Sequence, residues 1–279
     1  MSQQLSPSTY HRLPLGTAFG MTDVGLVRTS NEDNFLIDQT LGLVVVADGM
    51  GGHDDGEIAS ASAIIAVRDH LRSVIAASNA AVPAPLPGYD PDATWSDRTM
   101  PAVMTLFDAV ELANARLHAK NLADRYNEGC GMGTTLTGFW QCLERGRLVV
   151  FHVGDSRLYR YRDGKLAMLT RDQTLYQQAI DAGQIDNLPA GNLLLQAIGP
   201  SAVVKPEIRS HRYQAGDLYL LCTDGLHGKV PHGAIEDIIK NTGANRLQQA
   251  CADLIGLAKQ HGSRDNITAL LLLCDAGAP

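Results

Sequence analysis

Hydrophobic and polar residues follow two different periods along this chain. Residues 17–48 hold apolar runs broken by one polar loop, a pattern that predicts β-strands. Apolar residues recur at a spacing of about 3.6 in residues 57–77 and again in residues 102–126, which predicts two amphipathic helices. Five prolines fall in residues 80–101, so we expect an irregular, proline-rich loop between the helices.

After residue 133 the period changes to two. Residues 134–170 predict antiparallel strands, with a tight turn at Asp163-Gly164. Residues 171–205 are mixed in character and contain a short helical pattern near residues 175–182. The remaining predicted elements are a strand, a helix and a second strand, over residues 217–225, 244–259 and 265–275. Because helices and strands do not alternate one by one, this order argues against a doubly wound parallel sheet.

The N-terminal segment carries no targeting signal. Residues 1–16 lack a basic region followed by an apolar one, so we expect a flexible polar arm rather than a signal peptide. No stretch of 18 apolar residues occurs, which argues against a transmembrane helix. These features predict a cytoplasmic protein without a membrane partner.

Composition and charge narrow the choice of partners. The chain has 279 residues, of which 45% are hydrophobic, enough for one large core. A formal net charge of -7 argues against nucleic acid as the main partner. A local site can still be positive, so the charge does not exclude a phosphorylated substrate. We expect a monomer by default.

Aspartates stand repeatedly at the ends of strand-like runs. Asp48 follows "LVVVA", Asp224 follows "YLLCT", Asp265 precedes "NITALLLL", and Asp155 follows "LVVFHVG". Each of them alone is best read as a turn residue, because Asp-Gly is a common turn pair. Four in one chain favour a convergent acidic site. Such carboxylates would repel one another unless a divalent cation bound them, and oxygen ligands select Mg²⁺ or Mn²⁺ over Zn²⁺.

Six segments, in order along the chain, resemble the motifs of one protein family. They are "GLVRTSNEDN", "VVADGMGGHDDGEIAS", "GMGTTLT", "HVGDSRLYRYRDGKL", "LLCTDGL" and "RDNITALLLL". They resemble the PPM-type (type 2C) metal-dependent serine/threonine protein phosphatases, bacterial branch. The resemblance implies an α+β fold, a four-layer α-β-β-α sandwich with two central antiparallel β-sheets flanked by helices. It also implies a single domain over residues 17–276, with residues 171–205 as a flap beside the site.

The resemblance assigns metal ligands to particular residues. Asp48 resembles the ligand that bridges two metal ions, and Gly49 resembles a ligand that uses its backbone carbonyl. Asp224 and Asp265 resemble the other ligands of the first ion. Glu32 resembles the acidic residue that reaches the second ion through water. The expected cofactors are two Mn²⁺ or Mg²⁺ ions.

Further roles follow from the same resemblance. Asp155, together with Asp224, resembles a third metal site of bacterial members, and Asp33 is expected to stand behind the ligands. Arg28 resembles the arginine that holds the substrate phosphate, a role that suits its planar guanidinium. Met50 stands where many relatives carry a histidine thought to protonate the leaving group. Methionine cannot donate a proton, so a metal-bound water is the expected acid.

The implied activity is hydrolysis of phosphoserine and phosphothreonine in proteins. A metal-bridging hydroxide would attack phosphorus directly, without a phospho-enzyme, and the protein would oppose a serine/threonine kinase in bacterial signalling. Two alternatives remain open. One is a catalytically silent phosphatase-like domain that binds phosphoproteins and regulates a partner. The other is a two-metal nuclease or phosphodiesterase, which is disfavoured because the acidic chain lacks basic patches for a polynucleotide.

Overall fold

The computed structural model describes most of the chain, namely residues 4–51, 55–80, 99–141 and 146–275. The predicted proline-rich loop lies largely outside the described residues, because residues 81–98 are not among them. No helix within this described part has both the length and the apolar character that a membrane span needs.

The first sheet joins strands from both ends of the chain. Its six strands are antiparallel to their neighbours and lie in the order β1-β2-β12-β11-β8-β9. The strands are β1 (Tyr10–Leu13), β2 (Gly16–Asp23), β8 (Arg157–Arg162), β9 (Lys165–Met168), β11 (Leu218–Cys222) and β12 (Ile267–Cys274). β12 lies near the centre, and all but one of its residues are buried.

The second sheet is built from the middle of the chain. Its strands lie in the order β10-β7-β6-β4-β3, and the short β5 also pairs with β4. The strands are β3 (Asp33–Asp38), β4 (Leu43–Met50), β5 (Gly133–Thr134), β6 (Leu136–Trp140), β7 (Arg147–Val153) and β10 (Glu207–Arg212). All of the pairs are antiparallel.

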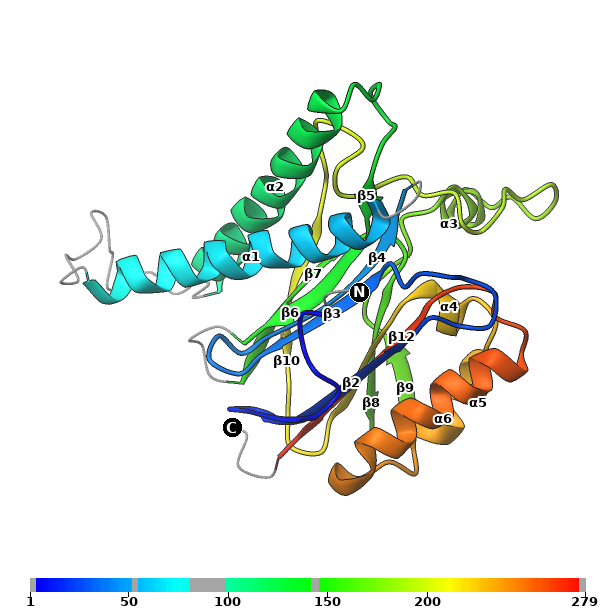
Figure 1. Cartoon of the computed structure of the whole chain (residues 1–279). Helices are drawn as coiled ribbons and strands as arrows, with labels where there is room; N and C mark the ends of the chain where they lie inside the picture. Colours follow the sequence, from blue (N-terminus) through cyan, green and yellow to red (C-terminus); the bar gives the residue numbers. More distant parts are fainter. Residues whose placement is uncertain (1–3, 52–54, 81–98, 142–145, 276–279) are drawn as a thin grey trace.

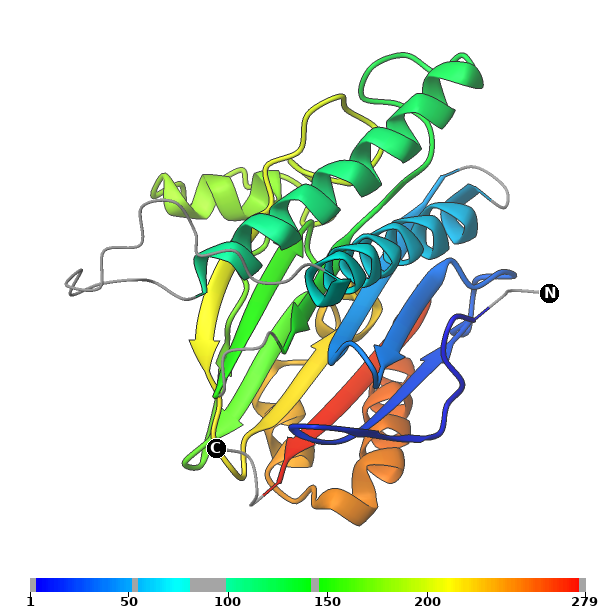
Figure 2. The same ribbon diagram turned by 90° about the vertical axis from the view of Figure 1, so that its left-hand side faces the viewer.

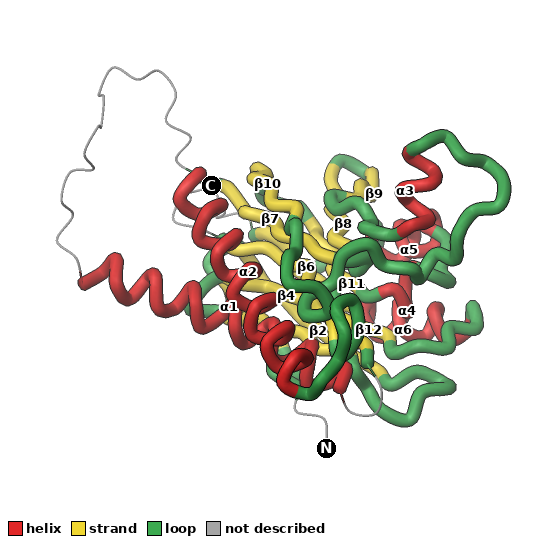
Figure 3. Tube along the Cα trace, turned by 90° about the horizontal axis from the view of Figure 1, so that it is seen from above, coloured by secondary structure: helices red, strands yellow, loops and turns green. Residues whose placement is uncertain are grey.

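Helices cover the outer face of each sheet. Figure 1 shows α1 and α2 on one side of the paired sheets and α5 and α6 on the other. Figure 3 shows the strands enclosed between these two groups of helices. The helices are α1 (Asp55–Ala80), α2 (Met100–Ala123), α3 (Leu175–Asp181), α4 (Asp224–His227), α5 (His232–Ile239), the 3₁₀ turn η1 (Ala244–Arg246) and α6 (Leu247–Gln260).

Three buried apolar clusters separate the four layers. One lies between α1, α2 and the second sheet, and another lies between the first sheet and α5 and α6. The third lies between the two sheets, where Val44 and Val46 of β4 meet Leu270 and Leu272 of β12. Figure 2 shows the two sheets facing each other. The predicted α+β four-layer sandwich is confirmed.

The apolar runs of the central strands follow from this layering. A strand that is covered on both faces needs apolar residues at consecutive positions rather than at alternate ones. In β4, the first five residues are buried, because α1 covers one face and the other sheet covers the second. The run "LVVVA" therefore ends at a rigid strand terminus.

The prediction of a flexible arm over residues 1–16 is wrong for its second half. Residues Tyr10–Leu13 form β1 and pair with β2. Leu13 and Leu15 are 2% and 0% exposed, and both belong to the core between the sheets. Burial of these two leucines holds the segment in place, although most of the residues before it are polar.

Candidate metal centre

Strand ends from both sheets meet at one edge of the sandwich. Asp48 lies near the end of β4, Asp224 begins α4 just after β11, and Asp265 lies two residues before β12. Asp155 lies in the turn between β7 and β8. These four aspartates, Arg28, Glu32, Gly49 and Met50 all line one cavity of about 260 Å³. Every predicted site residue except Asp33 therefore lies at this cavity.

Backbone hydrogen bonds hold the end of β4 in position. The Asp48 N–H donates to Thr135 Oγ1 (2.9 Å), and the Asp48 carbonyl accepts from the Thr135 N–H (2.9 Å). The Gly49 N–H donates to the carbonyl of Glu32 (3.2 Å). A Cβ atom at Gly49 would lie 2.0 Å from the carbonyl oxygen of Gly56 and 2.6 Å from that of Glu32. Only glycine fits at this position.

Asp33 lies behind the cavity, directly across from Asp48 in the β3–β4 register. It is 5% exposed, and its Oδ2 accepts hydrogen bonds from Thr223 Oγ1 (2.8 Å) and Thr268 Oγ1 (2.7 Å). Its Oδ1 is buried without a hydrogen-bond partner among the described residues. Burial, with the nearby charge of Asp224, raises the pKa of Asp33 to about 7.

The aspartates around the cavity destabilise one another's charged forms. Burial raises the pKa of Asp48 well above its ordinary value, and the charges of Asp33 and Asp224 add to the effect. Burial and Asp224 raise the pKa of Asp155 to about 7. Burial and Asp265 likewise raise the pKa of Asp224. The cavity therefore disfavours the ionised forms of several neighbouring carboxyl groups.

This arrangement fits divalent cations. The donors are all oxygen atoms, which hard cations such as Mg²⁺ and Mn²⁺ prefer. Asp224 Oδ1 is buried and, within the described part of the chain, has no hydrogen-bond partner. A bound dication would satisfy such atoms and remove the repulsion between carboxylates. No three His, Cys, Asp or Glu side chains of the described residues form a compact ligand cluster, so the carboxylates surround the cavity without closing into a shell.

Arg28 reaches the cavity from the loop between β2 and β3. Its Nη2 donates to Asp265 Oδ2 at 2.9 Å, and its side chain is 48% exposed. One end of the guanidinium is thus held beside a predicted metal ligand, while the side chain remains accessible to solvent. That position suits a group that binds an anion at the edge of the cavity.

Asn266 organises the loop that carries Arg28 and Glu32. Its Oδ1 accepts from the Glu32 N–H (2.9 Å), and its Nδ2 donates to the carbonyls of Val24 (3.0 Å) and Ser30 (2.9 Å). It is 3% exposed. Asn266 is not among the site residues predicted from the sequence. Its place directly after Asp265, in "RDNIT", is the one signal that could have pointed to it.

Replacing Asn266 with alanine should loosen this loop. The change removes three hydrogen bonds and leaves the buried Glu32 N–H without an acceptor, at a cost of about 1–3 kcal/mol. We also expect kcat/KM to fall by about 10- to 100-fold, since Glu32 and Arg28 lose their support. Thermal unfolding and turnover assays measure both effects.

Asn241→Ala is the matched control, because Asn241 is exposed and its side chain makes one hydrogen bond, to the carbonyl of Asp237. The control should stay within about 0.5 kcal/mol of the unsubstituted protein. Equal effects of the two substitutions would show that Asn266 does not support the site.

Met50 and Asp155 complete the cavity. Met50 lines it and supplies no proton donor. Asp155 is 7% exposed, and its backbone carbonyl accepts a hydrogen bond from His227 Nε2 (3.0 Å). That bond connects the β7–β8 turn to α4, so the His227 side chain ties the backbone at Asp155 to the helix that begins at Asp224.

Comparison with known proteins gives one consistent family. A protein-family model described as "Protein phosphatase 2C" matches residues 27–271. The chain is 32% identical over 259 residues to the "Serine/threonine phosphatase stp" of Listeria innocua, covering 90% of this chain and 93% of that protein.

Solved structures give the same result. The crystal structure of the Mycobacterium tuberculosis serine/threonine phosphatase PstP/Ppp is 31% identical, with a TM-score of 0.74, over 92% of this chain and 98% of that one. A structure of the PstP catalytic domain in complex with two manganese ions has a TM-score of 0.72 at 31% identity, over 92% of this chain and 97% of that one. The resemblance inferred from the sequence motifs is confirmed. The chain belongs to the protein phosphatase 2C family.

Proposed function

We propose that this protein is a metal-dependent phosphatase that hydrolyses phosphoserine and phosphothreonine in proteins. The observation that carries the proposal is the meeting of Asp48, Asp224 and Asp265, which come from different strand ends, at one cavity beside Arg28. The raised pKa values of Asp48 and Asp224 support it, because they indicate that the ionised carboxylates are unstable in this cavity unless a cation is bound. The names of the relatives from Listeria and Mycobacterium agree with it.

The proposed cofactors are two Mn²⁺ or Mg²⁺ ions. Asp48 and the carbonyl of Gly49 would hold them together with Asp224 and Asp265, and Glu32 would contribute through water. When bound, such ions supply a nucleophilic water at neutral pH and neutralise negative charge on the phosphoryl group. The two manganese ions in the PstP catalytic domain support this proposal. A third ion at Asp155 and Asp224 is proposed on the same donor chemistry.

The other residues at the cavity have positioning roles in this proposal. Arg28 would hold two phosphate oxygens with its planar guanidinium, next to the Asp265 carboxylate that it already contacts. Asp33 would support the ligands through its hydrogen bonds to Thr223 and Thr268. Since Met50 cannot donate a proton, the leaving alkoxide would take its proton from water.

The proposed partners are phosphorylated proteins and a cognate serine/threonine kinase in the cytoplasm. A silent phosphoprotein-binding regulator is the second candidate. The complete set of carboxylates at the cavity favours the enzyme over that candidate. Hydrolysis of a phosphoserine peptide with Mn²⁺, abolished by a chelator, is the expected result. Peptide binding without any turnover would instead favour the regulator, and nicking of a plasmid would favour a nuclease.

Binding of Mn²⁺ should strengthen as the pH rises from 6 to 8. Asp33 and Asp155 have pKa values raised to about 7, so protons compete with the metal below that pH. The ionised fraction of a group with this pKa rises from about one-tenth to about nine-tenths over that range. If the metal binds only the ionised group, its affinity rises by about tenfold. The upward shift in Tm on adding Mn²⁺ should therefore be larger at pH 8. An equal or smaller shift at pH 8 would contradict the proposed ligands.

A further inference from the structure

A second, larger cavity lies beside the metal centre. It has a volume of about 560 Å³, within the range of about 300–1,000 Å³ that is typical of ligand sites. Four of its lining residues also line the cavity of the metal centre, namely Asp155, Asn192, Asp224 and Asp265. The two cavities therefore adjoin. The others come from the start of β8, from the predicted flap, from α4 with the residues after it, and from the loop before β12.

Two of the charged side chains at this cavity pair with each other. Arg157 forms two hydrogen bonds with Asp172, Nε to Oδ1 at 2.9 Å and Nη2 to Oδ2 at 2.7 Å. Asp155, Asp224 and Asp265 belong to the metal centre described above. Two cations are left over at the lining, one on each of two neighbouring loops.

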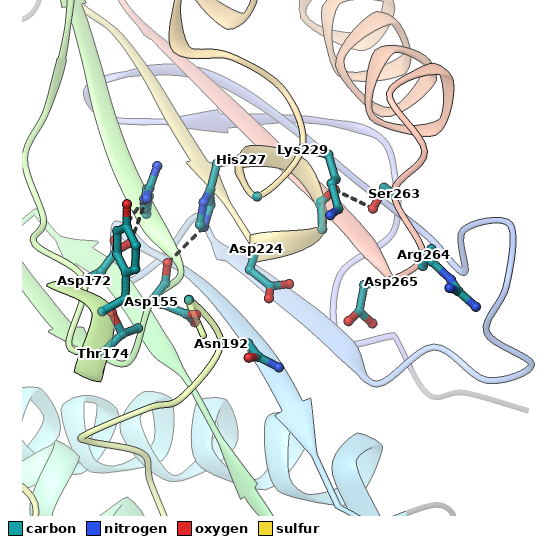
Figure 4. Close-up of a pocket in the computed structure, with 15 residues that line it drawn as sticks. Asp155, Asp172, Thr174, Asn192, Asp224, His227, Lys229, Ser263, Arg264 and Asp265 are labelled. Carbon is teal, nitrogen blue, oxygen red and sulfur yellow. Dashed lines mark hydrogen bonds and ion pairs between the residues drawn. The ribbon is translucent and has the colours of Figure 1, made fainter. Parts of the chain in front are cut away.

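These two cations are Lys229 and Arg264. Both are exposed, and neither side chain makes an ion pair or hydrogen bond with any residue that the structure describes. Figure 4 shows them on the Asp265 side of the cavity, with Asp172 and Thr174 on the opposite side of Asp224. A phosphorylated chain that enters the metal centre could thus place neighbouring residues beside two unpaired positive charges.

The backbone around these cations is well supported. Arg264 directly precedes Asp265, and Lys229 follows α4, which begins at Asp224. Ser263 Oγ donates to the carbonyl of Gly225 (2.8 Å), which connects the two loops. Lys229 and Arg264 therefore extend from two backbone segments that are connected beside the metal centre, and both side chains are exposed.

We infer that this cavity binds the polypeptide next to the phosphorylated residue, and that Lys229 and Arg264 bind an acidic group there. This inference rests on the proposed phosphatase function. The acidic group is a carboxylate or a second phosphate, since both are anions that lysine and arginine bind. The two cations thus select substrates with negative charge near the phosphorylated residue, in a protein whose net charge would otherwise repel them.

Paired phosphoserine peptides test this inference. Glutamate is placed at each of three positions on either side of the phosphoserine in turn, and glutamine at the same position is its neutral partner. A further peptide carries a second phosphoserine instead. We expect kcat/KM to be about two- to fivefold higher for the acidic member at one or more positions, as suits exposed charge pairs. The peptide set also shows whether a carboxylate or a second phosphate is preferred.

Charge reversal gives the sharper result. The double substitution Lys229→Glu and Arg264→Glu should invert the preference, so that a lysine-flanked peptide exceeds the glutamate-flanked one. The ratio of kcat/KM for the two peptides is taken within each variant, so an effect on the metal centre that is common to both peptides cancels. Lys165→Glu is the matched control, because Lys165 is exposed and lies at the opposite end of the β8–β9 pair from Arg157. The control should keep the original ratio.

The same peptides are also compared for binding, by fluorescence anisotropy in the presence of a chelator. No turnover with any peptide, but tighter binding of the acidic ones, would overturn the proposed function and support the cation site. Equal kcat/KM and equal affinity for acidic and neutral peptides at every position would overturn the cation site. So would an unchanged preference in the double variant.

Discussion

Asp48→Asn should abolish turnover and at the same time stabilise the metal-free protein. Loss of the carboxylate that is predicted to bridge both metal ions should lower kcat/KM by at least about a thousandfold. The same carboxylate has a pKa raised well above its ordinary value by burial and by Asp33 and Asp224. Its charge therefore opposes folding when no cation is bound. An uncharged amide of the same shape removes that repulsion.

The stabilisation should depend on pH with a definite sign. A carboxyl group whose pKa is raised in the folded state costs little stability below its unfolded pKa, and the cost grows as the pH rises toward the folded value. The Tm of metal-free Asp48→Asn should therefore exceed that of the unsubstituted protein by more at pH 8 than at pH 5. Each kcal/mol corresponds to about 2–4 °C.

A surface aspartate supplies the control for Asp48→Asn. Asp163 lies in the β8–β9 turn at the far end of the sheet, with a φ of 51° that asparagine also tolerates. Asp163→Asn should leave both turnover and Tm nearly unchanged. If Asp48→Asn kept its activity, or if it lowered the Tm of the metal-free protein at pH 8, the proposed role of Asp48 would be wrong.

Gly49→Ala should damage both stability and activity. The added Cβ would lie 2.0 Å from the carbonyl oxygen of Gly56 and 2.6 Å from that of Glu32. Both are backbone atoms, so β4, the start of α1 and the Arg28–Glu32 loop cannot all keep their positions. We expect a loss of about 3 kcal/mol in the free energy of unfolding. Turnover should fall strongly, because the carbonyl of Gly49 and the loop beside it move.

The matched control is Gly256→Ala. Gly256 lies inside α6, and a Cβ there would meet no atom within 4 Å apart from the nearby backbone of its own helix and its two chain neighbours. Alanine should therefore stabilise the protein by about 0.5–1 kcal/mol through helix propensity. Chemical denaturation measures both variants. Similar stability for Gly49→Ala and the unsubstituted protein would show that the β4 end is more adaptable than its contacts indicate.

Much of the fold was predictable, because burial leaves a strong pattern in the sequence. The run "LVVVA" in β4 and the run "ALLLL" in β12 are apolar at consecutive positions, since both faces of each strand are covered. The predicted helices over residues 57–77 and 102–126 correspond to α1 and α2. The family resemblance supplied the layering, which strand patterns alone do not determine.

Other elements have weaker sequence signals. β10 lies at the edge of its sheet, and none of its residues is fully buried, so its pattern does not alternate. In α1, the large apolar residue Ile58 is 42% exposed, whereas Ala59 and Ala63 are 0% exposed. The small side chains of these alanines form the buried face at the start of α1, so a pattern of large apolar residues does not reveal that face.

The residues of the candidate site also differ in how well the sequence predicts them. The aspartates were predictable because each stands at the end of a strong strand signal, and the motifs gave them roles. Asn266 was missed because its partner Glu32 lies 234 positions away, and nothing local in the sequence marks that bond. Lys229 and Arg264 were missed for a related reason, since exposed cations are common and only the fold places these two at one cavity.

The most direct test of the central claim is anomalous diffraction from crystals grown with Mn²⁺. We expect two strong manganese peaks in the cavity that Asp48, Asp224 and Asp265 line, with an oxygen of Asp48 bonded to both ions and the carbonyl of Gly49 facing one of them. A cavity without manganese, or manganese bound only at other carboxylates, would contradict the account.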